Sequence, residues 1–206
     1  MKRSSRFLPG VEQLESRDLF ATYTVTTVGD AMSNAVFIRR DHYEVATLRG
    51  AITEANANPG PDVIDFNIRI PGTGTQIRGA RIFVFSALPT ITGQVTILGT
   101  TQRDLVGIDG AGIAGAATGL EFTSSKNSII GLWITRFQGS AVAFRGTPGV
   151  VGSNRISSCF LGTSPQGTPG LGNFVGIEIH GSSQNDIGGT VAVDASDHSP
   201  PQRHFW

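Results

Sequence analysis

The feature that most constrains the fold is a loose internal repeat in the second half of the chain. Residues 127–134 (NSIIGLWI) align with residues 154–161 (NRISSCFL), and residues 185–189 (NDIGG) begin a third copy. The leading asparagines of the three segments are 27 and 31 residues apart. Repeats of this length, built from short strand-like segments, are typical of proteins in which each repeat stacks on the one before it. The repeat predicts an all-β fold, a right-handed parallel β-helix (β-solenoid), with its axis starting near residue 60.

A second series of segments alternates with the asparagine-led ones, at residues 119–122, 141–144 and 176–179. In each segment two apolar residues lie two positions apart, so they share one face of a strand. A single repeat cannot bury such a face, and several must therefore stack. These apolar pairs are predicted to form an inward core stack: Leu120, Phe122, Val142, Phe144, Ile177 and Ile179.

The asparagines Asn127, Asn154 and Asn185 are predicted to form a structural ladder, because asparagine tolerates turn conformations and stacked amides can hydrogen-bond from repeat to repeat. A polar ligand-binding stripe is the alternative interpretation. Cys159, the only cysteine, aligns with Leu132 and is predicted to be a core residue rather than a reactive thiol. The spacing between repeats lengthens at residues 163–173. This Gly- and Pro-rich insertion is predicted to be a protruding loop.

One helix is predicted in the first half of the chain, at residues 47–57. Thr47 can cap it, while Leu48, Ala51, Ile52 and Ala55 fall on one face, and the prolines within residues 58–61 end it. Gly50 weakens the helix, so its stability must come from packing. A variable loop is predicted over residues 29–45. Strands are predicted at residues 23–28, 63–68, 81–85, 94–98 and 106–110.

These elements predict four parts. Residues 1–22 form a leader or disordered export segment, and residues 23–62 form an N-terminal cap with one short capping α-helix. The β-helix repeats occupy residues 63–190. Residues 191–206 form an irregular tail without repeat character, which is interpreted as a truncation of a longer surface protein.

Composition narrows the classes of partner. The charged fraction is 16%, and 16 basic residues balance 16 acidic ones, so a nucleic-acid partner is not expected. The chain has no run of about 18 apolar residues, and a membrane span is not expected either. A single cysteine excludes an internal disulfide framework. The basic start is not followed by the apolar region of an ordinary secretion signal.

Several stretches resemble known families. Residues 46–66 (ATLRGAITEANANPGPDVIDF) resemble the CSLREA motif that precedes β-helices in large bacterial surface proteins, with Ala46 and Thr47 in place of its Cys-Ser. Residues 88–102, 160–163 and 188–190 are similar to the pectin-lyase-like β-helix repeats of the same proteins. Residues 14–21 (LESRDLFA) look like a LEPR-type leader of bacterial extracellular proteins. The resemblance implies an extracellular or cell-surface location in a bacterium.

The same resemblance raises the possibility of catalysis, because some pectin-lyase-like proteins are polysaccharide lyases that use clustered aspartates for calcium and a basic residue to abstract a proton. Arg136 and Arg145 are candidate bases, but no aspartate cluster accompanies them. Glu121 and Glu178 are predicted to point outward in register, as a solvated face rather than a calcium pair. Trp133 is interpreted as a core-edge residue, with a sugar-stacking platform as the alternative.

No residue is therefore assigned a catalytic or metal-binding role, the four histidines show no metal-ligand spacing, and no cofactor is expected, calcium being possible but not indicated. The favoured function is an extracellular structural or adhesive module that binds polysaccharide or another cell-surface component. A polysaccharide lyase is the main alternative, and an inert remnant of a degraded gene is a third.

Overall fold

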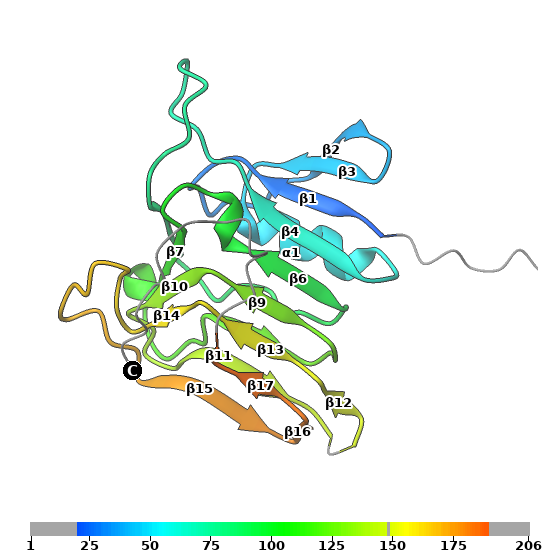
Figure 1. The fold of residues 1–206 in the computed structure, drawn as a ribbon, viewed down its shortest axis with the longest axis vertical. Coiled ribbons are helices and arrows are strands. Elements are labelled where there is room, and N and C mark those ends of the chain that lie inside the picture. The colour runs from blue at the N-terminus through cyan, green and yellow to red at the C-terminus, as the bar shows by residue number, and fades with distance from the viewer. Residues whose placement is uncertain (1–19, 148, 190–206) are drawn as a thin grey trace, which may run out of the picture.

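The computed structural model describes residues 20–147 and 149–189. Within them the chain is mostly strand, arranged in several sheets with almost entirely parallel pairing, together with one α-helix (Figure 1). The predicted tail and nearly all of the predicted leader lie outside the described residues. No helix in the described ranges is long and apolar enough to cross a membrane.

The first sheet has eight strands and is here called the long sheet. All its neighbours pair in parallel except β2 and β3, which are antiparallel. In spatial order its strands are β17 (Asp186–Ile187), β13 (Arg155–Ser157), β9 (Ser128–Ile130), β6 (Val95–Leu98), β4 (Asp62–Phe66), β1 (Thr22–Val25), β3 (His42–Val45) and β2 (Ala35–Arg39).

Three smaller sheets are parallel throughout. The four-stranded sheet runs β14 (Phe160–Leu161), β10 (Leu132–Thr135), β7 (Val106–Asp109) and β5 (Ala80–Phe83). The three-stranded sheet runs β15 (Val175–His180), β11 (Ser140–Arg145) and β8 (Leu120–Phe122). The strands β12 (Val151–Gly152) and β16 (Ser182–Ser183) pair with each other, and two short 3-10 helices are η1 (Gly99–Thr101) and η2 (Gly110–Gly112).

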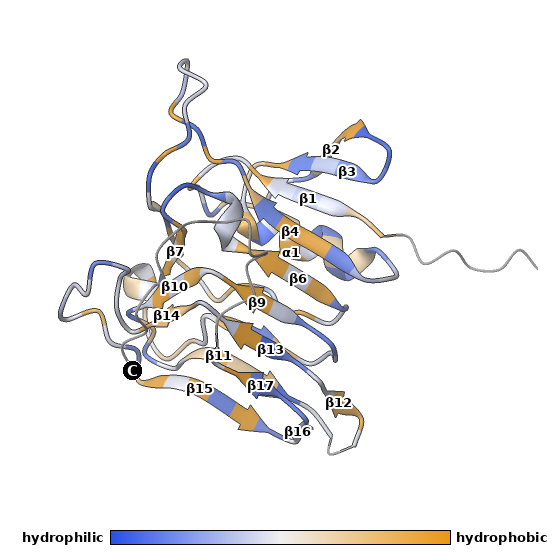
Figure 2. Ribbon diagram, in the orientation of Figure 1, coloured by the Kyte–Doolittle hydropathy of each residue, from blue (hydrophilic) through white to orange (hydrophobic). Residues whose placement is uncertain are grey.

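From β6 onward the chain visits the long, the four-stranded and the three-stranded sheet in turn, and each strand pairs in parallel with the preceding strand of the same sheet where there is one. The asparagine-led segments lie side by side in this way, with Ile129 paired to Ile97 on one side and to Ile156 on the other. Isoleucines recur at this position in β4, β6, β9, β13 and β17. Apolar residues accordingly gather along the stacked strands, while the connecting segments are mostly polar (Figure 2).

The apolar residues of the sheets form one hydrophobic core. Leu120, Phe122, Val142 and Phe144 are buried in it, but Ile177 is only half-buried and Ile179 is 46% exposed. Ile177 packs against the edge of the core, whereas Ile179 is not the buried core residue that the sequence predicted. They stand in register with Val142 and Phe144, but β15 is the edge strand of its sheet within the described residues, so one side of each isoleucine lacks a neighbouring strand.

The predicted helix is confirmed as α1 (Leu48–Ala57), and its buried face contains the predicted apolar residues. The Thr47 side chain caps it by accepting the Gly50 N–H at 3.1 Å. Gly50 weakens a helix intrinsically, but here a Cβ would clash with the carbonyl oxygen of Ser33. The close packing that requires glycine also supplies the stability that the isolated helix lacks.

The predicted variable loop at residues 29–45 is wrong, because it contains the antiparallel hairpin of β2 and β3. Its turn has no glycine, which hides it from the usual hairpin signals. Asp41 provides the turn instead with a φ of 56°, a conformation that aspartate tolerates better than most residues. Residues 36–38 (VFI) of β2 are exposed.

Candidate functional site

The outer face of the four-stranded sheet carries a row of side chains that are aligned by the strand register. Arg81 of β5 pairs with Gly107 of β7, which pairs with Trp133 of β10, which pairs with Phe160 of β14. A Cβ at Gly107 would clash with the six-membered ring of Trp133, so the absence of a side chain lets the indole lie against the strand. Trp133 is therefore placed on the outer face of the sheet, and it is nevertheless only 6% exposed.

Arg81 and a loop cover this tryptophan. The Arg81 guanidinium carbon lies 5.3 Å from the centroid of the Trp133 ring and 4.8 Å from that of Phe83, distances typical of cation–π contacts. The predicted protruding loop leaves the sheet after β14 (Figure 1). Residues of this loop line a cavity together with Arg81 and Trp133. Ser164 anchors the loop by hydrogen bonds with the hydroxyl of Thr168 at 2.7 Å and with its N–H at 3.2 Å.

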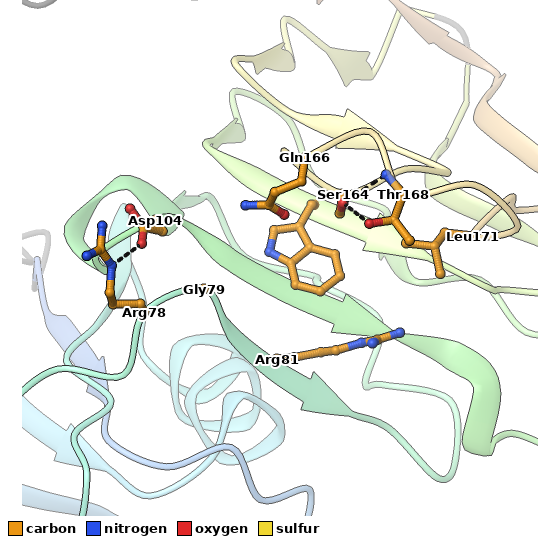
Figure 3. Close-up of a pocket in the computed structure, with 9 residues that line it drawn as sticks. Arg78, Gly79, Arg81, Asp104, Ser164, Gln166, Thr168 and Leu171 are labelled. Atoms are coloured by element: carbon orange, nitrogen blue, oxygen red, sulfur yellow. Dashed lines mark hydrogen bonds and ion pairs between the residues drawn. The ribbon is translucent and has the colours of Figure 1, made fainter.

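A cavity of about 500 Å³ lies between the row and the loop, which is within the usual size range of small-ligand sites. In Figure 3 the ion pair of Arg78 and Asp104 lies on one side of the cavity, and Ser164, Thr168 and Leu171 lie on the other. Arg78 Nε and Asp104 Oδ2 are 2.6 Å apart. The remaining lining residues are Gly79, Arg81, Trp133 and Gln166.

The fully buried carboxylate of Asp109 contacts two arginines, one of which is the cavity residue Arg81. Arg136 binds it with both arms, Nε to Oδ1 at 2.9 Å and Nη2 to Oδ2 at 2.7 Å. Oδ1 also accepts the Ala111 N–H at 3.0 Å, which caps η2. Arg81 forms a second ion pair with Oδ2. One negative charge therefore serves two positive ones.

Two buried donors at this place have no acceptor within the described residues, the Nε1–H of Trp133 and the Nε–H of Arg81. Buried polar groups are nearly always hydrogen-bonded, so such pairs of open donors are unusual. Burial, followed by the proximity of Arg136, lowers the pKa of Arg81. Burial and the neighbouring Arg136 both destabilise the positive charge of Arg81, and the ion pair with Asp109 offsets this only in part.

The outer face of the three-stranded sheet has a different charge arrangement. Glu121 and Glu178 both pair in register with Ala143, so they point outward in line as the sequence predicted. Arg145 lies between them, with its Nε 3.0 Å from Glu121 Oε2 and its Nη1 2.8 Å from Glu178 Oε1. Hydrogen bonds from Ser140 and then from Arg145 lower the pKa of Glu178. Both carboxylates are thus tied to the same arginine.

This ion-pair network lies in a second cavity of about 660 Å³. The exposed ring of Phe174 and the segment around Thr90 also line it. Thr90 donates its hydroxyl to Glu121 at 3.3 Å, so the polar groups at the base of this cavity largely satisfy one another.

The two candidate lyase bases are therefore engaged with carboxylates, Arg136 with Asp109 and Arg145 with Glu121 and Glu178. Hydrogen bonds with Glu121, and then with Glu178, raise the pKa of Arg145 further. A base must accept a proton, and the contacts of Arg145 keep its guanidinium protonated. No group of three His, Cys, Asp or Glu side chains that could hold a metal ion occurs in the part of the chain that the structure describes.

The three asparagines lie one above the other at the turns into β9, β13 and β17. Asn127 donates its side-chain amide to Asn154 Oδ1 at 2.9 Å, and Asn154 donates to Asn185 Oδ1 at 3.1 Å. The same oxygens accept backbone N–H groups, and Asn127 Oδ1 accepts that of Val95 at 2.9 Å. The side-chain oxygens of all three asparagines and the amide nitrogens of Asn127 and Asn154 are hydrogen-bonded within the fold, which favours the structural ladder over a ligand-binding stripe.

Cys159 packs against the hydrophobic core, and burial raises the pKa of its thiol to about 11. A thiol with this pKa is almost entirely protonated at neutral pH and is a poor nucleophile.

Sequence reasoning missed Arg81 and Asp109 as a site. A signal existed, because residues 81, 109 and 136 are spaced by nearly one repeat length, but the repeat was recognised only after residue 119. The predicted loop and Trp133 were singled out separately, and only the folded structure brings them together.

Comparisons of the chain with family models, with curated proteins and with solved structures found no match. The likeness to CSLREA and pectin-lyase-like proteins accordingly stays a resemblance of short motifs.

Proposed function

We propose that the chain is a right-handed parallel β-helix that acts outside a bacterial cell as a structural or adhesive module and binds glycan on its outer face. The parallel registers and the ordered visits to three sheets support the β-helix. Crossover connections between parallel strands of one sheet are almost always right-handed, which supports the handedness. The export motif in residues 14–21 supports the location.

The observation that carries the binding proposal is the cavity beside Trp133. It combines the guanidinium groups of Arg78 and Arg81 with the side-chain amide of Gln166 from the loop, on the side of a stack of strands. Such donors suit the many oxygen atoms of a polysaccharide. The small exposed area of Trp133 argues against a stacking platform, so we assign recognition to these polar side chains and a shaping role to the indole.

Affinity electrophoresis of the full chain through gels that contain a panel of bacterial and plant polysaccharides tests this function. We expect at least one polymer to retard the chain and Trp133→Ala to abolish the retardation. Phe174→Ala is the matched control, because it removes an exposed ring from the other cavity. A chain that no polymer retards, or equal retardation of both variants, contradicts the proposal.

Cysteine cross-linking tests the β-helix in a Cys159→Ser background. Ser128 pairs with Arg155 in the parallel register, so Ser128→Cys with Arg155→Cys should form a disulfide under mild oxidation. An antiparallel hairpin would instead bring residue 128 next to residue 157. Preferential cross-linking of Ser128→Cys with Ser157→Cys would therefore exclude this fold.

A further inference from the structure

We infer that two copies of this chain associate through β2, the edge strand of the long sheet, and form a dimer around a two-fold axis near Phe37. β2 pairs with β3 on one side only, and the hairpin of the two strands lies at one end of the stack (Figure 1). Three features of this hairpin carry the inference: its open backbone groups, its exposed apolar side chains and the order of charge along it. The inference is independent of the proposed glycan binding.

The backbone of β2 has hydrogen-bonding groups that point out of the sheet. The Ala35 N–H donates to Glu54 Oε1 at 2.9 Å, and the carbonyl oxygen of its strand partner Val45 accepts from the segment after β1. These two paired residues therefore do not bond to each other. Antiparallel pairs alternate between bonded and non-bonded ones, so Phe37 and Tyr43, two positions further on, are a non-bonded pair as well. The N–H and C=O of Phe37 accordingly point away from β3, toward the open edge.

The side chains of the same strand are apolar and exposed. Val36, Phe37 and Ile38 are 62%, 63% and 48% exposed. Successive residues of a strand point to opposite faces, so apolar groups are exposed on both faces of this edge. Charged residues or prolines usually protect such an edge, but the three central residues of β2 are all apolar. An edge of this kind is a typical site for pairing with another strand.

The order of charge along the hairpin selects a second copy of the chain as the partner. Arg39 lies at one end of β2, and the exposed Glu44 of β3 lies at the other end, opposite Val36. Arg39 pairs with His42, two residues before Glu44, so both charged side chains lie on the same face. Neither has an ion-pair partner among the residues that the structure describes. A second copy whose β2 runs in the opposite direction brings each Arg39 to the end of the strand where the other copy has Glu44.

The two-fold arrangement makes every contact twice. The Phe37 N–H of each copy donates to the Phe37 carbonyl oxygen of the other, as residues of a bonded antiparallel pair do. The exposed apolar residues of the two strands cover one another, and two ion pairs between Arg39 and Glu44 flank them. Such a dimer is closed, because it uses the same edge of both copies. One short strand buries a small area, so the association is weak and depends on concentration.

Sedimentation equilibrium of the full chain over a range of concentrations tests the inference. We expect a reversible equilibrium between monomer and dimer. Val36→Lys should raise the dissociation constant by more than about tenfold, because it places a charge in the interface and opposite Arg39 of the other copy. Val150→Lys is the matched control, since it makes the same change at a valine that is 72% exposed outside the hairpin. It should change the dissociation constant by less than about twofold.

A mixing experiment separates a lost contact from a misfolded variant. Arg39→Glu gives a hairpin with two acidic groups, and Glu44→Arg gives one with two basic groups. Each variant alone should dimerise about threefold more weakly or worse, because like charges face each other across the two-fold axis. An equal mixture of the two should form a dimer of one copy of each at least as tightly as the unsubstituted chain, because both contacts are then between opposite charges. A misfolded variant could not restore the dimer in this way.

Every other outcome overturns the inference. The full chain remains monomeric at all concentrations if residues 1–19 or another segment of its own occupy the edge of β2. Assembly that continues beyond a dimer excludes the closed two-fold arrangement. Equal effects of the two lysine substitutions place the contact elsewhere, and a mixture that associates no better than its components removes the pairing of Arg39 with Glu44. None of these results bears on glycan binding at the four-stranded sheet.

Discussion

The outer faces of two neighbouring sheets show opposite ways of arranging charge on the same stack of strands. On the four-stranded sheet one buried carboxylate, Asp109, serves Arg81 and Arg136. On the three-stranded sheet one arginine, Arg145, serves Glu121 and Glu178. In the Asp109 cluster the carboxylate is fully buried, and two buried donors of neighbouring side chains lack an acceptor. In the Arg145 cluster all three side chains are partly exposed to solvent, and both carboxylates are paired with the guanidinium.

Two properties of such a cluster therefore decide whether it can bind a ligand. One is how deeply it is buried, and the other is whether the group shared by two partners is a carboxylate or a guanidinium. Water can compensate the excess negative charge of the half-exposed cluster, so that cluster needs no ligand. Water has little access to Asp109, and the cluster around it carries an excess of positive charge. The atoms of Arg81 and Trp133 that lack a partner there are hydrogen-bond donors. We therefore expect the Arg145 cluster on the three-stranded sheet to have a structural role and the Asp109 cluster on the four-stranded sheet to take part in binding.

Substitution of the shared carboxylate should have the largest effect on stability. Asp109→Asn leaves two guanidiniums side by side without a counter-charge, and we expect a loss of roughly 3 kcal/mol in the free energy of unfolding, at the low end for buried ion pairs because both arginines are partly exposed. Chemical denaturation measures it. Glu121→Gln on the other face should cost less than about 1 kcal/mol, and similar losses for the two variants would remove the distinction between the faces.

The asparagine ladder offers the same comparison for uncharged side chains, because Asn127 is buried and Asn185 is half-buried. Asn127→Ala should cost about 2 kcal/mol, because it leaves the buried Val95 N–H without its acceptor and removes one of the two donors to Asn154 Oδ1. Asn185→Ala should cost less than about 1 kcal/mol, since water can replace the half-buried Asn185 amide. Urea unfolding of both variants checks the order, and a larger loss for Asn185→Ala would contradict it.

Removal of the shared arginine on the half-exposed face should have a small effect. Arg145→Gln is expected to cost less than about 1 kcal/mol, because solvent screens the two glutamates that it leaves. Thermal unfolding at low and high salt measures this cost, which should shrink as salt is added. A loss comparable to that of Asp109→Asn would show that this cluster is not governed by solvent.

The pH dependence of Glu178 should be the smallest effect. Its pKa in the folded chain lies below the ordinary value of 4.5, owing to the hydrogen bonds from Ser140 and Arg145. Its contribution to stability is therefore present above the unfolded pKa and is lost as the pH falls through the folded pKa. Carboxyl carbon-13 titration should show the lowered pKa, and Arg145→Gln should raise it. An unchanged pKa in that variant would contradict the assigned cause.

Local patterns in the sequence predicted much of the secondary structure. The spacing of Leu48, Ala51, Ile52 and Ala55 and the cap at Thr47 were enough to predict α1, because a helix depends on neighbours three and four residues away. Alternating apolar residues predicted most of the strands, because the side chains of a strand alternate between its two faces. The hairpin of β2 and β3 was missed because its turn uses Asp41 rather than glycine.

The candidate site could not be predicted in this way. Arg81, Asp109 and Arg136 each follow ordinary strand patterns, and nothing local to any of them indicates that they share one carboxylate. Ile179 shows the same limit for the core, since its pattern matches that of Phe144 while its burial depends on which strand lies beyond it. Burial of an edge residue is a property of the neighbouring strand.

The sequence alone determined which residues point inward, where the helix lies and which segments are equivalent, because these follow from periods of two, of three to four and of about 27 to 31 residues. The tertiary structure alone decided that the indole lies against Gly107, that a loop closes over it, and that two arginines compete for one buried carboxylate. Electrostatic pairing depends on distance in space and on access of water, and stacking sets both between residues almost 30 positions apart.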